Sequence, residues 1–67
     1  MLRETFAQKV KETRLAKKVT QEQLADSAGF SVSYVSLLER GGRSASLETI
    51  ETIAKALKVS PLTLLGG

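Results

Sequence analysis

Residues 20–41 read TQEQLADSAGFSVSYVSLLERG and are the most informative part of the chain. Apolar residues recur there at intervals of three and four, which places them on one face of a helix. Gly29 interrupts this pattern, and glycine tolerates the left-handed backbone at which helices commonly end. Ser31 then offers a hydroxyl that can cap a second helix. The stretch predicts two short helices separated only by residues 29–31.

The turn between these helices is too tight for antiparallel packing and suits a steep crossing. Ala25 is small enough to let the helices approach each other, and Gly29 makes the turn. Val35 and Leu38 face inward and seat the second helix on the first. A small residue, a glycine and two apolar residues in this order predict a helix-turn-helix.

One local signature marks the beginnings of four helices. It consists of an apolar residue, a capping hydroxyl and a second apolar residue five positions after the first, which together form a hydrophobic staple. The instances are Val19-Thr20-Leu24, Phe30-Ser31-Val35, Ala45-Ser46-Ile50 and Val59-Ser60-Leu64. A further helix is expected from about Arg3 to Lys17. The fold class is therefore all-α, a compact five-helix domain over residues 1–67, with a terminus or the start of a linker at 66–67.

The composition excludes several kinds of site. The chain has no cysteine and no histidine, so disulfides, most metal ligands and nucleophilic triads are missing. Its seven carboxylates form no clustered pair in a plausible pocket. We therefore predict no catalytic residue, no metal, no cofactor and no small-molecule ligand. No apolar run is long enough to span a membrane and no leader begins at Met1, so we predict a cytoplasmic protein without a membrane partner.

Positive charge is unevenly distributed along the chain, whose formal net charge is +3. The basic residues gather in the first quarter and in the middle, at Lys9, Lys11, Arg14, Lys17, Lys18, Arg40 and Arg43. Glu48 and Glu51 mark a later, more acidic segment. A lopsided positive field of this kind is compatible with a polyanionic partner.

Several runs of this sequence resemble the phage repressor and Cro family. They are residues 20–25, Gly29, residues 33–36, 38–41, 46–50 and 53–57, and the resemblance covers about Phe6 to Leu65. It implies a lambda repressor-like fold in which the second helix of the motif lies in the major groove and the first straddles the DNA backbone. It also implies a sequence-specific transcriptional regulator that binds double-stranded operator DNA, a pseudo-palindrome, as a homodimer.

Six residues in and just after the second helix of the helix-turn-helix motif are candidates to contact DNA. Helical spacing turns outward Ser33, Ser36, Leu37 and Arg40, with Val32 and Tyr34 near the edges of that face. Serine discriminates weakly among bases, while Val32 and Leu37 offer only apolar contact, for example to a thymine methyl. Family members often carry glutamine or arginine at these two positions. We therefore expect few base-specific contacts from these side chains, and expect Arg40, Arg43 or DNA shape to supply the remaining sequence specificity.

Phosphate contacts are expected from the residues around the start of the motif. Gln21 opens its first helix, where backbone amides and the helix dipole favour a phosphate. The resemblance gives Gln21 a contact with phosphate and with the recognition helix, and the alternative is a tolerated first-turn residue. Lys17 and Lys18 lie at a turn near the DNA, or they belong to a solvated face. Lys18 also stands where the family often has glycine, which predicts strain. Tyr34 either contacts a phosphate or covers the edge of the core.

Arg14 and Glu39 are charged, yet both occupy inward-facing positions. The resemblance pairs them, and the ion pair would tie the end of the first helix to the end of the recognition helix as a structural element. Contact between Arg14 and a phosphate is the alternative. It would leave Glu39 facing DNA without compensation.

A leucine cluster near residue 64 predicts a dimer contact. Leu62, Leu64 and Leu65 exceed what a helix of one turn needs for anchoring. Because a lone domain rarely exposes such a cluster, part of it is expected to meet a second copy across a two-fold axis, as in similar domains.

The main alternative function is a helix-turn-helix module that binds a protein partner, like an antitoxin or a co-regulator. The outward face with Val32, Tyr34 and Leu37 is apolar enough for such a role. Salt distinguishes the two functions, because binding to DNA weakens steeply as salt rises and binding through an apolar interface does not.

Overall fold

The computed structural model describes residues 2–42 and 45–65. Its elements, in chain order, are α1 (Leu2–Ala16), α2 (Gln21–Ala28), α3 (Val32–Glu39), α4 (Leu47–Leu57) and α5 (Pro61–Leu64). No strand occurs within these ranges. The predicted all-α, five-helix class is confirmed, and α1 differs from its predicted bounds by one residue at each end.

Hydroxyl side chains define where the helices begin. The hydroxyl of Thr20 accepts a hydrogen bond from the backbone N–H of Gln23 at 3.0 Å, and the side chain of Gln23 accepts from the N–H of Thr20 at 2.9 Å. This reciprocal pair is a capping box at the start of α2. The other three caps are Ser31, Ser46 and Ser60. All four predicted caps are confirmed, so the starts of α2 to α5 follow from local sequence.

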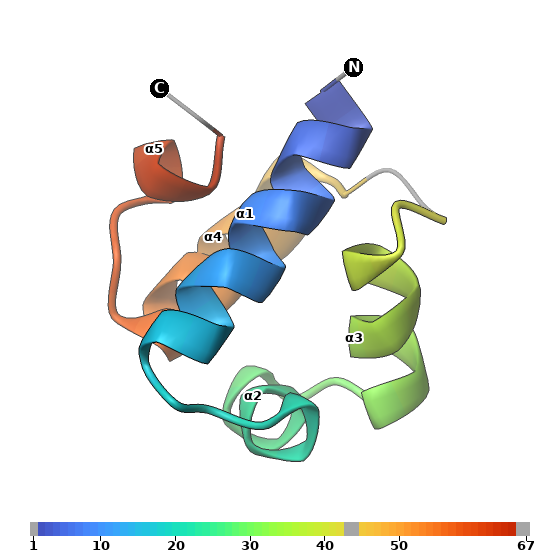
Figure 1. Ribbon diagram of the computed structural model, residues 1–67, viewed down its shortest axis with the longest axis vertical. Helices are drawn as coiled ribbons and strands as arrows, with labels where there is room; N and C mark the ends of the chain where they lie inside the picture. The colour runs from blue at the N-terminus through green and yellow to red at the C-terminus, as the bar shows by residue number, and fades with distance from the viewer. Residues whose placement is uncertain (1, 43–44, 66–67) are drawn as a thin grey trace.

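One core collects side chains from all five helices. In Figure 1, α4 lies behind α1, while α3 and α5 lie on opposite sides of α1 and α2 lies below it. The core residues are Phe6, Val10, Leu24, Ala25, Val35, Leu38, Ile50, Ile53, Ala54, Leu57 and Leu64. Because α2 packs on both α3 and α4, the helix-turn-helix is anchored to the rest of the domain and leaves one side of α3 free.

The prediction that Leu64 contributes to a dimer contact is wrong. Its side chain is 0% exposed within the single chain and belongs to the core. As the second apolar residue of its hydrophobic staple, it points inward from α5, which packs on α1 and α4. No surface of Leu64 is left for a second copy. Leu62, with 65% of its surface exposed, and the half-buried Leu65 remain available.

Two lysines adopt the left-handed backbone that favours glycine. Lys18, just after α1, has φ 58°, and Lys58, at the end of α4, has φ 60°. Gly29 and Gly41 take the same conformation after α2 and α3, as predicted. A residue with a Cβ atom pays about 1–2 kcal/mol for this conformation. The positive φ of Lys18 therefore agrees with the strain predicted at this position.

Replacing Lys58 with glycine is expected to raise the free energy of unfolding by about 0.5 kcal/mol, because relief of the left-handed strain exceeds the entropy cost of glycine. Lys55, also exposed but inside α4, is the matched control. Lys55→Gly is expected to lower the free energy of unfolding by about 1 kcal/mol. Urea unfolding of both variants checks the prediction, and equal destabilisation by the two changes would contradict it.

Candidate DNA interface

The turn between α2 and α3 is fixed by backbone and aromatic contacts. Gly29 has φ 77°, and the N–H of Phe30 donates to the carbonyl of Ala25 at 2.8 Å. The rings of Phe30 and Tyr34 form a T-shaped pair, with centroids 4.9 Å apart and planes at 77°. Tyr34 is half-buried and packs against the core. Of the two roles considered for Tyr34, this position favours covering the core.

The outward side of α3 offers small and apolar groups. Ser33 is exposed, Val32 keeps 41% of its surface exposed, and Ser36 is half-buried. Leu37 is also half-buried, because its side chain lies over the backbone of Gly42, where an added Cβ would be 2.6 Å from Leu37 Cδ1. These side chains offer fewer polar groups than a recognition helix with glutamine or arginine would.

Two arginines were predicted near this face. Arg40 follows α3 as its C-cap and is exposed, so its guanidinium is available at the end of the helix. Arg43 lies outside the described residues. Its predicted contact with DNA therefore stays a prediction.

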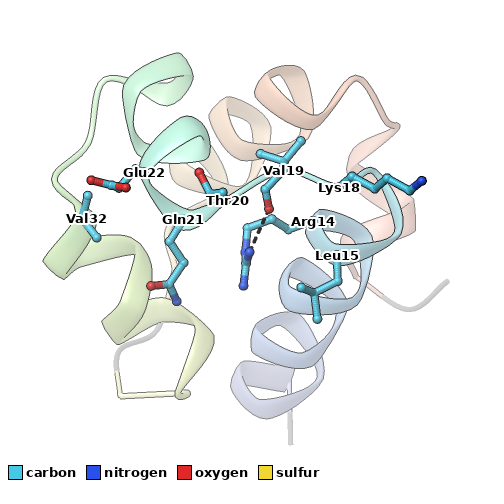
Figure 2. Close-up of a pocket in the computed structure, with 8 residues that line it drawn as sticks. All are labelled: Arg14, Leu15, Lys18, Val19, Thr20, Gln21, Glu22 and Val32. Atoms are coloured by element: carbon cyan, nitrogen blue, oxygen red, sulfur yellow. Dashed lines mark hydrogen bonds between the residues drawn. The ribbon is translucent and has the colours of Figure 1, made fainter.

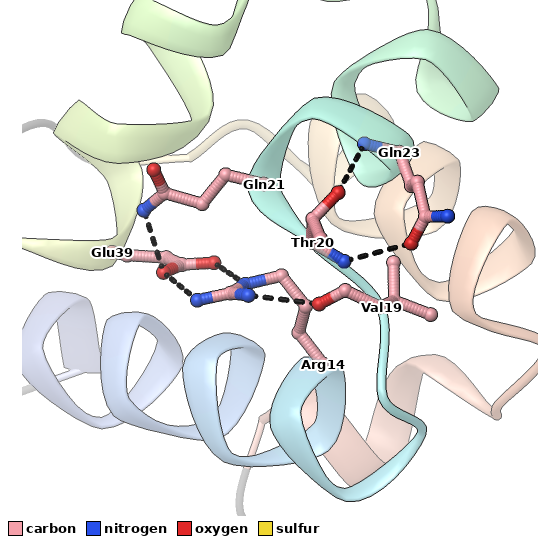
Figure 3. A network of polar contacts seen from close by, with 6 residues as sticks. All are labelled: Arg14, Val19, Thr20, Gln21, Gln23 and Glu39. Atoms are coloured by element: carbon pink, nitrogen blue, oxygen red, sulfur yellow. Dashed lines mark hydrogen bonds and ion pairs between the residues drawn. The ribbon is translucent and has the colours of Figure 1, made fainter.

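The predicted pair of Arg14 and Glu39 is confirmed. Arg14 Nε donates to Glu39 Oε2 at 2.7 Å and Arg14 Nη2 donates to Glu39 Oε1 at 3.1 Å, which is a bidentate geometry. The two side chains keep only 9% and 3% of their surface exposed. Arg14 Nη1 also donates to the carbonyl of Val19 at 2.8 Å. One guanidinium thus joins α1 to the end of α3 and to the segment that leads into α2 (Figure 3).

Gln21 adds a further contact to this pair. Its Nε2 atom donates to Glu39 Oε1 at 3.1 Å, and Figure 3 shows Glu39 lying between Gln21 and Arg14. The contact with the recognition helix that the resemblance implied for Gln21 is therefore present, since Glu39 is the last residue of α3. The sequence did not identify Glu39 as its partner. One argument could have pointed to it. A carboxylate can accept about four hydrogen bonds, so a buried Glu39 paired with Arg14 needs a further donor.

A hollow of about 570 Å³ opens beside this network, as Figure 2 shows. It brings together the end of α1, the start of α2 and the first residue of α3. Its lining residues are Arg14, Leu15, Lys18, Val19, Thr20, Gln21, Glu22 and Val32. Three predicted DNA contacts, Lys18, Gln21 and Val32, thus border one depression, and the side chain of Lys18 points away from the other two (Figure 2).

Sequence reasoning missed Leu15 and Glu22 as members of this hollow. Leu15 is 56% exposed and Glu22 is exposed in the first turn of α2. Lys17 is also exposed, in the turn after α1, but it does not line the hollow. The electrostatic character of the hollow is mixed, because the carboxylate of Glu22 offsets part of the field of Lys18.

Among the described residues, no group of three or more acidic side chains is placed to hold a metal ion. In that same part of the chain, no helix combines the length and the apolar character needed to cross a membrane.

Comparisons with known proteins agree with this architecture. The profile of the helix-turn-helix family matches residues 10–64. Control protein C.BamHI of Bacillus amyloliquefaciens is 46% identical over 65 residues, covering 96% of this chain and 80% of that protein. The immunity repressor protein of Bacillus phage phi105 is 39% identical over 62 residues, covering 92% of this chain and 43% of that protein.

A solved structure is equally similar. The restriction-modification controller protein C.AhdI of Aeromonas hydrophila superposes with a TM-score of 0.87 at 43% identity, covering 91% of this chain and 92% of that one. The fold, the sequence and the arrangement of α2 and α3 therefore all indicate a helix-turn-helix protein. The chain belongs to the helix-turn-helix family, of the phage repressor and Cro type that its sequence resembles.

Proposed function

We propose that this chain is a sequence-specific DNA-binding transcriptional regulator that binds a pseudo-palindromic operator as a homodimer. The observation that carries the proposal is the placement of α2 and α3. Val32 and Ser33 on the outward side of α3 are exposed, and the start of α2 lies beside Val32 at the same hollow. In this geometry α3 enters the major groove and the start of α2 faces a phosphate.

The contacts divide into two groups in this proposal. Phosphate contacts come from the start of α2 and from the turn before it, through Gln21, Lys17 and Lys18. Base contacts come from the outward side of α3, and the candidates are Val32, Ser33, Ser36, Leu37 and Arg40. Because these side chains provide few base-specific hydrogen bonds, DNA shape contributes to the choice of operator together with Arg43.

The homodimer is proposed from the surface that α5 leaves exposed. Leu62 is 65% exposed, and Leu65 lies beside it in sequence and is half-buried. Two copies joined across a two-fold axis would present two α3 helices to half-sites about one helical turn of DNA apart. A small domain gains affinity from such pairing, since the second half-site is bound at a high effective concentration.

The relatives also favour a particular class of regulator. The chain covers most of C.BamHI and C.AhdI, which are named as a control protein and a restriction-modification controller, but less than half of the phage immunity repressor. We therefore propose control of restriction-modification genes, in the cytoplasm and without an enzymatic step. An operator located upstream of such genes in the source genome would support this, and an operator located elsewhere would overturn it.

The proposed function is tested by selecting binding sites from a randomised double-stranded DNA pool. Affinity for the enriched duplex is then measured at several salt concentrations. An inverted repeat whose affinity falls steeply with salt is the expected result. No enrichment, together with binding that is insensitive to salt, would instead favour the protein-partner function.

Replacing Ser33 with alanine is expected to change the preference among half-site variants without a loss of stability, because Ser33 is exposed on the reading side of α3. Its contribution is expected to be modest, on the order of 1 kcal/mol for the base pair that it faces. Ser27→Ala, an exposed change on α2, serves as the control. Identical preferences for wild type and Ser33→Ala would remove Ser33 from the readout.

A further inference from the structure

The carboxylate of Glu39 contacts two parts of the domain, the helix α1 and the first residue of α2. It accepts two hydrogen bonds from Arg14, at 2.7 and 3.1 Å, and a third from Gln21 at 3.1 Å. The Glu39 side chain is only 3% exposed. A single buried group at the end of α3 therefore contacts α1, which anchors the fold, and the first residue of α2, which faces the hollow.

The bond to Glu39 constrains how Gln21 presents its amide. A glutamine side chain at a surface position populates several rotamers, and fixing it costs conformational entropy. Here one N–H of the Gln21 amide is held by Glu39, and the second N–H has no hydrogen-bond partner among the described residues. The free protein thus holds the amide in one orientation at the edge of the hollow, before any ligand is present.

We propose that Glu39 is a positioning residue for DNA binding: it holds the Gln21 amide in the orientation that contacts a phosphate. This inference rests on the proposed function. Glu39 is also the last residue of α3, so the same carboxylate fixes the phosphate contact relative to the helix that reads the bases. Pre-ordered contacts bind more tightly, because less entropy is lost on association.

Charge and burial explain why Glu39 acts through Gln21 and does not touch DNA itself. A free carboxylate would repel the phosphate backbone, but Arg14 neutralises this one and the pair is nearly inaccessible to solvent. Arg14 also holds the carbonyl of Val19, immediately before the Thr20 cap of α2. The start of α2 is therefore attached to the network through its backbone and through the Gln21 side chain.

A double-mutant cycle on DNA affinity tests this positioning role. The variants are Gln21→Ala, Glu39→Ala and both together, and the probe is the duplex enriched from the randomised pool. In the wild-type background, Gln21→Ala is expected to weaken binding about tenfold, since a hydrogen bond to a charged group is lost. In the Glu39→Ala background the same change is expected to cost about twofold or less, because no acceptor is left at position 39 to hold the Gln21 amide in place.

An equal loss of DNA affinity on Gln21→Ala in the two backgrounds would overturn the positioning role, because a purely structural Glu39 would leave the contribution of Gln21 unchanged. Affinities are measured at a temperature where circular dichroism shows every variant folded. If Glu39→Ala does not fold, the cycle is repeated with Glu39→Asp, which keeps a negative charge near Arg14 and shortens the reach of the carboxylate toward Gln21. A wild-type protein that enriches no duplex would instead overturn the proposed function itself.

Discussion

Replacing Glu39 with alanine is expected to lower the free energy of unfolding by about 3 to 5 kcal/mol. The reason is what the change leaves behind. Arg14, 7% exposed, would keep its charge and its contact with the carbonyl of Val19 but would lose the carboxylate that compensates it. A buried charge without a partner is far more costly than an absent pair.

Thermal unfolding measures this effect. A loss of 3 kcal/mol corresponds to a melting temperature lower by roughly 12 °C or more in a domain of this size. Glu51→Ala removes an exposed carboxylate from α4 and is expected to leave the melting temperature almost unchanged. Replacing Arg14 and Glu39 together by apolar residues is expected to recover most of the loss. A wild-type melting temperature for Glu39→Ala would show that the pair does not stabilise the fold.

Replacing Leu64 with alanine is expected to lower the free energy of unfolding by about 2 to 5 kcal/mol. Leu64 is fully buried where α5 packs on α1 and α4, so truncation leaves a cavity and removes apolar contacts. The neighbouring Leu62 offers a matched control, because it has the same side chain on the same helix but is 65% exposed.

The two leucine variants are expected to differ in their dependence on protein concentration. Leu64→Ala lowers stability at every concentration, since it damages the core of the single chain. Leu62→Ala is expected to change the stability of the monomer little and to shift the monomer–dimer equilibrium, measured by sedimentation, toward monomer. Equal stability losses for the two variants would contradict the assignment of Leu64 to the core and Leu62 to the surface.

Local signals predicted the helices well, because each helix start depends on residues close together in sequence. The caps at Thr20 and Ser31 and the left-handed turn at Gly29 needed only the identities of their neighbours. The staple Val59-Ser60-Leu64 likewise indicated that Leu64 points inward. The error was to treat Leu62, Leu64 and Leu65 together as one dimer contact, because a periodicity of only four residues does not separate the members of such a cluster.

The candidate site was predicted in part, and the missing part is tertiary. Gln21 and Glu39 were both selected from the sequence, but the bond between them joins residues 18 positions apart. That contact depends on the crossing of α2 and α3, which no local pattern determines. The position of Leu37 over Gly42 was missed for the same reason, since it depends on the path of the chain after α3.

The division of α3 into an anchored side and a free side has a consequence for engineering. Val35, Leu38 and Glu39 hold the helix to the domain, whereas Val32 and Ser33 contribute little to the core. A designer can therefore randomise the free positions while keeping the anchors constant. Libraries built in this way would retain folded proteins and yield regulators redirected to new promoters, with the scaffold unchanged.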